Sequence, residues 1–129
     1  MTFTEAMAFI SSFSRGGTPV RDLSRIGGLM EKLGNPQDSL QFLHIAGTNG
    51  KGSVAEYLTN ILMESGCRVG TFTSPYIRHY RDRIRINRED ISEAAVSSAC
   101  EIIRRYAAPE DGYSQFEITF AIALFKRMT

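Results

Sequence analysis

The sequence predicts an α/β fold in which a parallel β-sheet is flanked by helices. Residues 40–46 form a nearly continuous apolar run, which is typical of a strand buried on both faces of a parallel sheet. A glycine-rich turn follows, and residues 51–65 then carry an apolar stripe with helical spacing. A second short strand is expected at 68–73. Strand, helix and strand in this order predict a right-handed crossover between parallel strands.

Two amphipathic helices are expected ahead of this unit. The first begins near Thr2 and Glu5, which have the spacing of a capping box. The second has an apolar stripe over residues 23–33 and stops at a Gly-Asn-Pro sequence, a strong helix terminator. We therefore expect a helical lead-in over residues 1–36 and the α/β portion over residues 37–129.

The later segments extend the α/β pattern without completing it. We expect a short strand at 83–87, a helix capped by Asp90 or Ser92 that runs to about Tyr106, and a further helix over 116–128. A parallel sheet of two or three strands leaves its edges unpaired. We therefore expect these 129 residues to be a fragment of something longer.

Composition and charge exclude several classes of protein. Of the 129 residues, 43% are hydrophobic and 22% are charged, and the formal net charge is +1, as in soluble globular domains. The arginine-rich segment 78–88 is interrupted by acidic residues, so no nucleic-acid-binding face is expected. No apolar run reaches the roughly 20 residues that span a bilayer, and no signal peptide is visible. Because Cys67 and Cys100 match no metal-ligand spacing, we expect reduced thiols in a cytoplasmic protein without a membrane partner.

The most informative segment is the glycine-rich turn between the expected strand and helix. It reads His-Ile-Ala-Gly-Thr-Asn-Gly-Lys-Gly-Ser over residues 44–53. A buried strand before, glycines in the turn and a helix after are the context that a phosphate-binding loop requires. The glycines let backbone amides approach an anion, the helix directs its positive end at the same point, and Lys51 adds a mobile cation. Ser53 or Thr48 offers a hydroxyl for phosphate or magnesium.

The turn departs from the general phosphate-loop pattern in two places. Ile45 stands where that pattern has its first glycine, and Gly52 separates Lys51 from Ser53. The alternative is a flexible strand-to-helix turn that carries an exposed lysine. The strand, turn and helix together favour nucleotide binding over that alternative.

This variant loop resembles that of the Mur ligase superfamily, whose members form amide bonds through acyl phosphates. Within the superfamily, the loop is most similar to that of folylpolyglutamate and dihydrofolate synthases. Further segments resemble signatures of the family in the same order: Gly-Thr-Phe-Thr-Ser-Pro at 70–75, Asp-Arg-Ile-Arg-Ile-Asn at 82–87 followed by Ile91-Ser92, and Phe-Glu-Ile-Thr at 116–119. The sequence departs from the family's pattern at two places. Tyr76-Ile77 stands where the family usually has His-Leu on the pterin side of the site, and Asp82 stands where it usually has glutamate.

The resemblance implies that residues 1–129 are the N-terminal part of a Mur ligase ATPase domain with a P-loop parallel sheet. The rest of that domain and a C-terminal domain would then lie outside the chain. The resemblance also implies a set of site residues. Magnesium would be held by Ser74, at the carboxyl end of the second strand, and by Glu117. Read alone, Ser74 belongs to a Ser-Pro turn, and Glu117 is a helix-start glutamate that interacts with the helix dipole. ATP would be held by the loop, with Lys51 as the catalytic cation: Gly47, Thr48, Asn49, Gly50, Lys51, Gly52 and Ser53.

The activity that the resemblance implies is ATP-dependent addition of L-glutamate to dihydropteroate or reduced folates by a monomeric full-length enzyme. Two alternatives stay open on the residues alone. One is another Mur-type amide ligase, and the other is a truncated nucleotide-binding fragment without catalytic activity. A chain limited to these 129 residues is expected to be inactive, because the family's second metal-binding segment and its glutamate-binding domain would lie beyond it.

Overall fold

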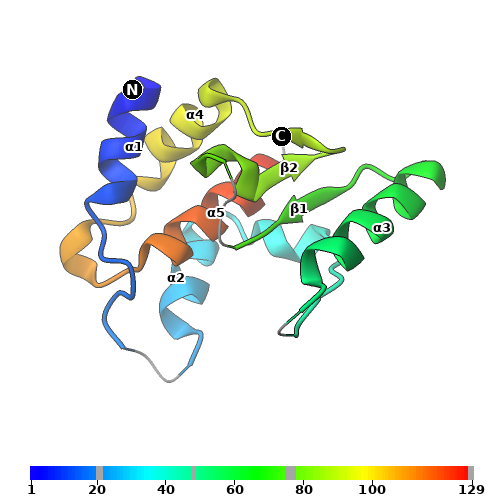
Figure 1. The fold of residues 1–129 in the computed structure, drawn as a ribbon. Coiled ribbons are helices and arrows are strands. Elements are labelled where there is room, and N and C mark those ends of the chain that lie inside the picture. The colour runs from blue at the N-terminus through cyan, green and yellow to red at the C-terminus, as the bar shows by residue number, and fades with distance from the viewer. Residues whose placement is uncertain (20–21, 48, 75–77, 128–129) are drawn as a thin grey trace. The chain divides into compact units, whose positions relative to one another are not determined.

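The computed structural model describes residues 1–19, 22–47, 49–74 and 78–127, and the chain forms two compact units. Unit 1 consists of residues 1–40 and 93–129, and unit 2 consists of residues 41–92. The chain, coloured from its N-terminus to its C-terminus in Figure 1, therefore leaves unit 1 at residue 40 and returns to it at residue 93.

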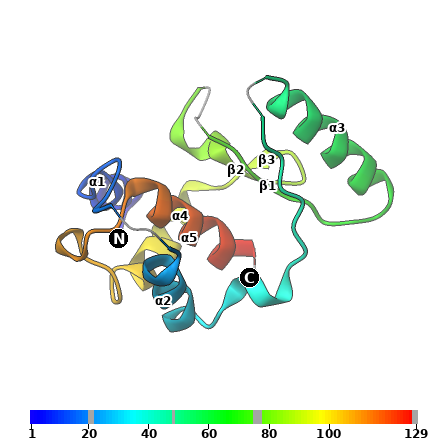
Figure 2. The same ribbon diagram turned by 90° about the horizontal axis from the view of Figure 1, so that it is seen from below.

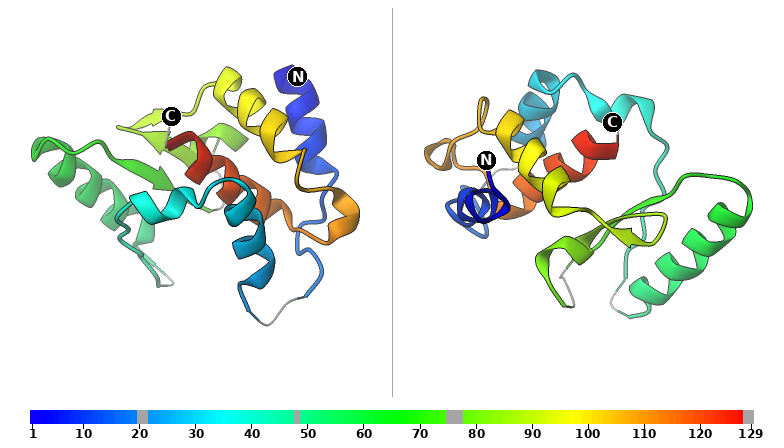
Figure 3. Two further views of the ribbon diagram at one scale, coloured as in Figure 1. Left: turned by 180° about the vertical axis from the view of Figure 1, so that it is seen from behind. Right: turned by 90° about the horizontal axis from the view of Figure 1, so that it is seen from above.

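The described part of unit 1 is built from helices. Helix α5 contacts α1, α2 and α4, and α4 also packs against α1. Figure 2 shows α4 beside α5, and the left panel of Figure 3 shows α1 beside α4. α5 is therefore the central helix of this unit. The α-helices are α1 (Phe3–Ser11), α2 (Ser24–Lys32), α4 (Glu93–Ile103) and α5 (Gln115–Arg127), with 3₁₀ helices at Pro36–Ser39 and Pro109–Asp111.

One apolar face of α4 and one of α5 form the core of unit 1. Ile118 and Ile122 of α5 have no exposed surface, and neither do Val96, Ala99 and Ile103 of α4. These residues recur three or four positions apart, which places them on one face of each helix. Burial of an aliphatic side chain of this size stabilises a fold by roughly 1.5–3 kcal/mol.

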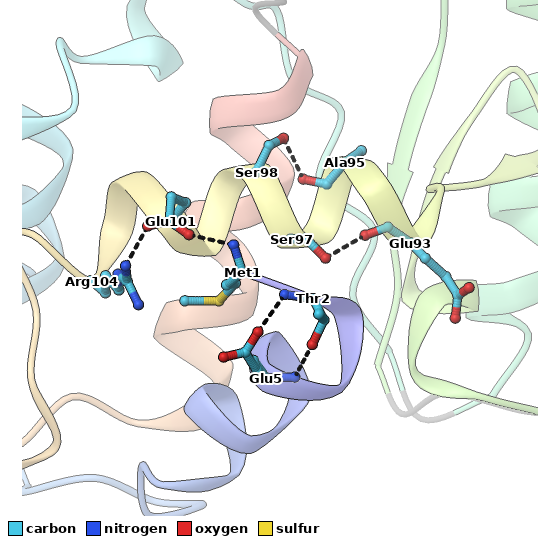
Figure 4. A network of polar contacts seen from close by, with 9 residues as sticks. All are labelled: Met1, Thr2, Glu5, Glu93, Ala95, Ser97, Ser98, Glu101 and Arg104. Carbon is cyan, nitrogen blue, oxygen red and sulfur yellow. Dashed lines mark hydrogen bonds and ion pairs between the residues drawn. The ribbon is translucent and has the colours of Figure 1, made fainter.

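Polar contacts fix the start of α1 (Figure 4). Thr2 and Glu5 form the predicted capping box: the Glu5 backbone N–H donates to Thr2 Oγ1 at 3.1 Å, and the Thr2 backbone N–H donates to Glu5 Oε1 at 2.8 Å. The α-amino group of Met1 donates to Glu101 Oε2 at 2.7 Å, and Arg104 donates to the other carboxylate oxygen. The Met1 ammonium and Arg104 hold the pKa of Glu101 below its ordinary value, so charge as well as packing joins α1 to α4.

Unit 2 contains helix α3 (Lys51–Glu64) and, in its described part, a three-stranded antiparallel sheet. Asn87 and Arg88 connect the second and third strands with φ values of 49° and 71°. Positive φ at both positions is the geometry of a type I′ hairpin turn, and asparagine adopts it readily. The strands are β1 (Gly70–Phe72), β2 (Ile84–Ile86) and β3 (Glu89–Asp90), in the order β1-β2-β3, with Thr71 opposite Arg85 and Arg85 opposite Asp90.

The parallel sheet expected from the sequence is not present in the described residues. Residues 41–47 are irregular and take part in no backbone hydrogen bond of the described chain, and Phe42 and Leu43 are 54% and 65% exposed. β1 forms inside the second predicted strand, but it pairs antiparallel with β2. An extended segment becomes a strand only where a neighbour supplies hydrogen-bond partners. Here β2, rather than the apolar run before the glycine-rich turn, is the neighbour of β1.

The other predicted elements are confirmed with shifted ends. α3 occupies the expected helix at 51–65, β2 lies inside the strand expected at 83–87, and α5 corresponds to the stretch 116–128. Cys67 is exposed and Cys100 is buried, and both are free thiols as expected. Burial raises the pKa of the Cys100 thiol to about 12, which keeps it protonated and unreactive at neutral pH.

Gly112→Ala is expected to destabilise unit 1. Gly112 has φ +86°, in the left-handed region where a residue with a Cβ loses about 1–2 kcal/mol. The added Cβ would also lie 2.6 Å from Thr18 Oγ1, so Thr18 would have to move. Gly28→Ala on α2 is the matched control, because a Cβ there meets no atom within 4 Å and alanine favours a helix. Denaturant unfolding should show a loss for the first variant and a gain for the second, and equal midpoints would contradict the backbone geometry at Gly112.

Candidate nucleotide and metal site

The glycine-rich loop leads directly into the N-terminus of α3. Gly47 and Gly50 have φ values of +145° and +78°, which glycine adopts without steric cost. Gly50 is the N-cap residue of α3 and has no side chain that could cap the helix. The first amide groups of an α-helix have no acceptor within the helix. Gly50 makes no side-chain cap hydrogen bond, so among the described residues the N-cap position leaves these N–H groups open to an external acceptor.

Three exposed residues begin α3 at this point: Lys51, Gly52 and Ser53. A helix N-terminus that carries glycine-rich backbone and a cation attracts anions, and phosphate above all. The turn and the following helix that the sequence prediction required are both present, whereas the preceding segment is irregular. Thr48, also predicted to contact the nucleotide, lies outside the described residues, while Asn49 is exposed in the loop.

Ser74 lies in unit 2, two residues after the end of β1. It is exposed, and its Oγ accepts a hydrogen bond from Arg83 Nη2 at 3.4 Å. Arg83 also donates from Nε to the carbonyl of Thr73 at 3.3 Å, and its guanidinium lies 5.6 Å from the centre of the Phe72 ring. The Ser74 hydroxyl is therefore at the surface beside a guanidinium. Residues 75–77 lie outside the described residues, and they include Tyr76 and Ile77, which stand in place of the family's His-Leu pair.

Glu117 lies in unit 1, at the third position of α5. Ser114 caps this helix: Ser114 Oγ accepts from the Glu117 backbone N–H at 3.0 Å, and Glu117 Oε1 accepts from the Ser114 backbone N–H at 2.9 Å. The same carboxylate accepts two hydrogen bonds from Arg25 of α2, from Nη2 to Oε1 at 2.6 Å and from Nε to Oε2 at 3.2 Å. Glu117 therefore belongs to a capping box and to a bidentate ion pair at the same time.

Burial and hydrogen bonding act on the Glu117 carboxyl group in opposite directions. Burial alone would raise its pKa, because a less polar environment disfavours the charged form. The hydrogen bonds from Arg25 and Ser114, together with the charge of Arg25, outweigh burial and hold the pKa below its ordinary value. Glu117 is therefore ionised at neutral pH.

The predicted site residues belong to different units. The loop and Ser74 lie in unit 2, and Glu117 lies in unit 1, so a magnesium site made by Ser74 and Glu117 together stays a prediction. Among the residues that the structure describes, no group of three or more histidine, cysteine, aspartate or glutamate side chains is placed to hold a metal ion.

Sequence reasoning missed the partners of Glu117. The spacing of Ser114 and Glu117 is a capping-box signature that can be recognised in a sequence. Arg25 is separated from Glu117 by 92 positions and shares no motif with it, so the sequence contains no signal for this ion pair. The contact between Arg83 and Ser74 likewise depends on the pairing of β1 with β2.

Comparison with known proteins gives consistent matches, although no protein-family model matches the chain. A folylpolyglutamate synthase from Lacticaseibacillus casei is 38% identical over 129 residues, which cover 100% of this chain and 29% of that protein. A dihydrofolate synthase/folylpolyglutamate synthase from Bacillus subtilis is 46% identical over 71 residues, which cover 55% of this chain and 16% of that protein. The solved structure of Mycobacterium tuberculosis folylpolyglutamate synthase complexed with ADP matches 98% of this chain and 29% of that chain, with a TM-score of 0.80 and 32% sequence identity.

The fold is thus that of synthases of the Mur ligase type. Within that class, the chain is similar over its whole length to a folylpolyglutamate synthase and over 55% of its length to a dihydrofolate synthase/folylpolyglutamate synthase. It spans 29% of the length of the Lacticaseibacillus casei relative. Among the described helices, none has the length and apolar character that a membrane crossing requires.

The stabilising contribution of Glu117 is expected to depend on pH. Because its folded-state pKa lies below the ordinary value of 4.5, the charged carboxylate stabilises the fold above that value. The contribution is lost as the pH falls through the folded-state pKa. Denaturant unfolding should therefore show a stability difference between the wild type and Glu117→Gln that is full at neutral pH and shrinks in the acid range. A difference that stays constant throughout would contradict this account of the carboxylate.

Proposed function

We propose that the natural protein containing this chain is an ATP-dependent ligase that joins L-glutamate to dihydropteroate or to a reduced folate. The observation that carries this proposal is the similarity of the whole chain, at 38% identity, to a folylpolyglutamate synthase. The Bacillus subtilis relative bears the names of both activities in the family. Both acceptors are therefore part of the proposal, whereas no observation favours another Mur-type amide ligase.

ATP is the proposed phosphoryl donor, and the loop before α3 is its proposed site. The Mycobacterium tuberculosis relative is complexed with ADP. In this chain, Gly47 and Gly50 turn the backbone, and the uncapped first turn of α3 offers amide hydrogens to phosphate oxygens. The exposed side chains of Lys51 and Ser53 extend from the same turn and supply a cation and a hydroxyl.

The proposed reaction has two steps. A carboxylate of the acceptor attacks the γ-phosphorus of ATP, which forms an acyl phosphate and releases ADP. The amino group of glutamate then attacks the acyl carbon, so that an amide bond forms and phosphate leaves. Positioning and neutralisation of charge supply most of the rate of phosphoryl transfer. Lys51 is the residue of this chain that we assign to charge neutralisation at the phosphates.

Magnesium, when bound with the nucleotide, would neutralise further phosphate charge. Hard cations take oxygen ligands, and we propose that Ser74 supplies one. The residues present fit this role unequally. The Ser74 hydroxyl is exposed, and its hydrogen bond from Arg83 is long at 3.4 Å, so it can be exchanged. Glu117 fits poorly, because both oxygens of its carboxylate already accept hydrogen bonds from Arg25.

In the whole protein, we propose that residues 40–46 form the strand of a parallel P-loop sheet. The apolar character of this run and the exposure of Phe42 and Leu43 support this proposal, because both side chains gain from burial between helices. Residues 1–129 would then be the N-terminal part of the ATP-binding domain, with residues 1–36 as its helical lead-in. The complete enzyme is proposed to act as a monomer.

Lys51→Ala in the natural protein is expected to reduce glutamate ligation by at least about a hundredfold, the usual effect of losing one charge-stabilising group. Lys32→Ala is the control, because Lys32 is an exposed lysine in the last turn of α2. Both variants should unfold at the same midpoint as the wild type. The measurement is ATP-dependent incorporation of labelled glutamate, and near-normal turnover by Lys51→Ala would overturn the assignment of the loop.

The same assay identifies the acceptor when dihydropteroate and tetrahydrofolate are supplied separately. Incorporation with one or both of them, dependent on ATP, is the expected result. A protein that incorporates glutamate with neither acceptor would not have the proposed activity, even if it binds nucleotide.

A further inference from the structure

We propose that Glu117 is a structural residue of unit 1, which holds Arg25 in place, and that it is not a ligand of magnesium. Together the two residues fasten the connection between α1 and α2 to the N-terminus of α5. This inference concerns contacts within unit 1 and does not depend on the proposed function.

Both oxygens of the Glu117 carboxylate are occupied. Oε1 accepts from Arg25 Nη2 at 2.6 Å and from the Ser114 backbone N–H at 2.9 Å, and Oε2 accepts from Arg25 Nε at 3.2 Å. Two parallel N–H bonds from one guanidinium are the strong form of carboxylate recognition by arginine. The three hydrogen bonds take three of the roughly four lone pairs of the carboxylate, and the charge of a metal ion at the remaining one would repel the guanidinium.

The ion pair is largely withdrawn from water. The side chains of Arg25 and Glu117 are each 13% exposed. Removing one partner from such a pair is strongly destabilising, because the other charge is left without compensation. If the Glu117 carboxylate turned to a metal ion, Arg25 would be that uncompensated charge.

Arg25 also contacts the segments on either side of the pair. Its Nη1 donates to the carbonyl of Thr18 at 2.6 Å, and the Thr18 backbone N–H donates to the carbonyl of Gly112 at 2.8 Å. The guanidinium lies 5.9 Å from the centre of the Tyr113 ring, within the range of a cation–π contact. One guanidinium therefore joins α2, the chain before α2 and the turn before α5, and Glu117 is the group that compensates its charge.

Unit 2 contains a matched ion pair that differs in burial. Arg88 Nη2 lies 2.6 Å from Glu56 Oε1, the same distance as between Arg25 Nη2 and Glu117 Oε1. The side chains of Arg88 and Glu56 are 53% and 46% exposed, so water screens their attraction. At equal contact distance, the comparison therefore shows the joint effect of burial and of the bidentate contact between Arg25 and Glu117.

A double-mutant cycle in the natural protein that contains this chain tests the proposal. It uses Glu117→Gln, Arg25→Met and the double variant, with Glu56→Gln, Arg88→Met and their double variant as the control. Glu117→Gln removes the charge but keeps the capping box, since glutamine also serves in that motif. We expect a coupling of at least about tenfold in the unfolding equilibrium constant for the buried pair and less than about threefold for the exposed pair. Equal coupling in both pairs would overturn the proposal.

A further variant covers the case in which a single substitution abolishes folding. Arg25→Lys keeps the positive charge but cannot form the two parallel bonds. Its unfolding midpoint should lie below that of the wild type and above that of any Arg25→Met protein that folds. A midpoint equal to that of the wild type would show that the bidentate contact does not hold the unit together.

Magnesium titration provides the second readout. Unfolding midpoints of the natural protein that contains this chain, and of its Glu117→Gln variant, are measured with and without millimolar MgCl2 at constant ionic strength. We expect magnesium to change both midpoints equally or to change neither. A magnesium-dependent gain in the wild type that Glu117→Gln lacks would overturn the proposal, because it would place the ion on this carboxylate.

Discussion

The structure of unit 1 depends on the burial of α5. This helix contacts α1, α2, α4 and the 3₁₀ helix at Pro36–Ser39, and its Ile118 and Ile122 have no exposed surface. A helix packed on several sides needs partners for its first N–H groups, because water reaches them poorly. Ser114 and Glu117 provide this cap, and Arg25 neutralises the charge that the cap introduces. The burial of α5 in the apolar core therefore requires the ion pair at the edge of that core.

Helix α3 shows the opposite arrangement. Its N-cap residue, Gly50, cannot cap the helix with a side chain, and Tyr57 and Ile61 on its surface are 69% and 59% exposed. Such a helix is not held in place by a deep core, but its first turn stays open to an external anion. The N-terminus of α5 is satisfied within the protein, whereas that of α3 is available to the phosphates of the proposed nucleotide. The start of α5 thus contributes to stability, and the start of α3 is the proposed recognition site.

Helices could be predicted from the sequence because their signals are local. The Thr2–Glu5 capping box and the extent of α3 follow from residues three or four positions apart. Sheet pairing could not be predicted in this way. The apolar run at 40–46 indicates that the segment can be buried in a sheet, but its pairing depends on distant residues. In the described chain, β1 pairs with β2, which continues into β3 through the tight turn at Asn87 and Arg88.

The interpretation of Glu117 meets the same limit at the level of one residue. A carboxylate in a largely apolar helix must be paired, protonated or bound to a metal. The sequence shows a glutamate in all three cases and cannot distinguish them. The structure contains the paired solution, with a partner 92 positions away. If this one carboxylate also bound a dication, the charge of the buried Arg25 guanidinium would no longer be fully compensated. Ser74 faces no such conflict, because its hydroxyl is at the surface and carries no charge that another part of the fold requires. The two magnesium ligands predicted from one resemblance therefore differ in how well they are suited to bind the ion. The difference arises from their tertiary surroundings rather than from their motifs.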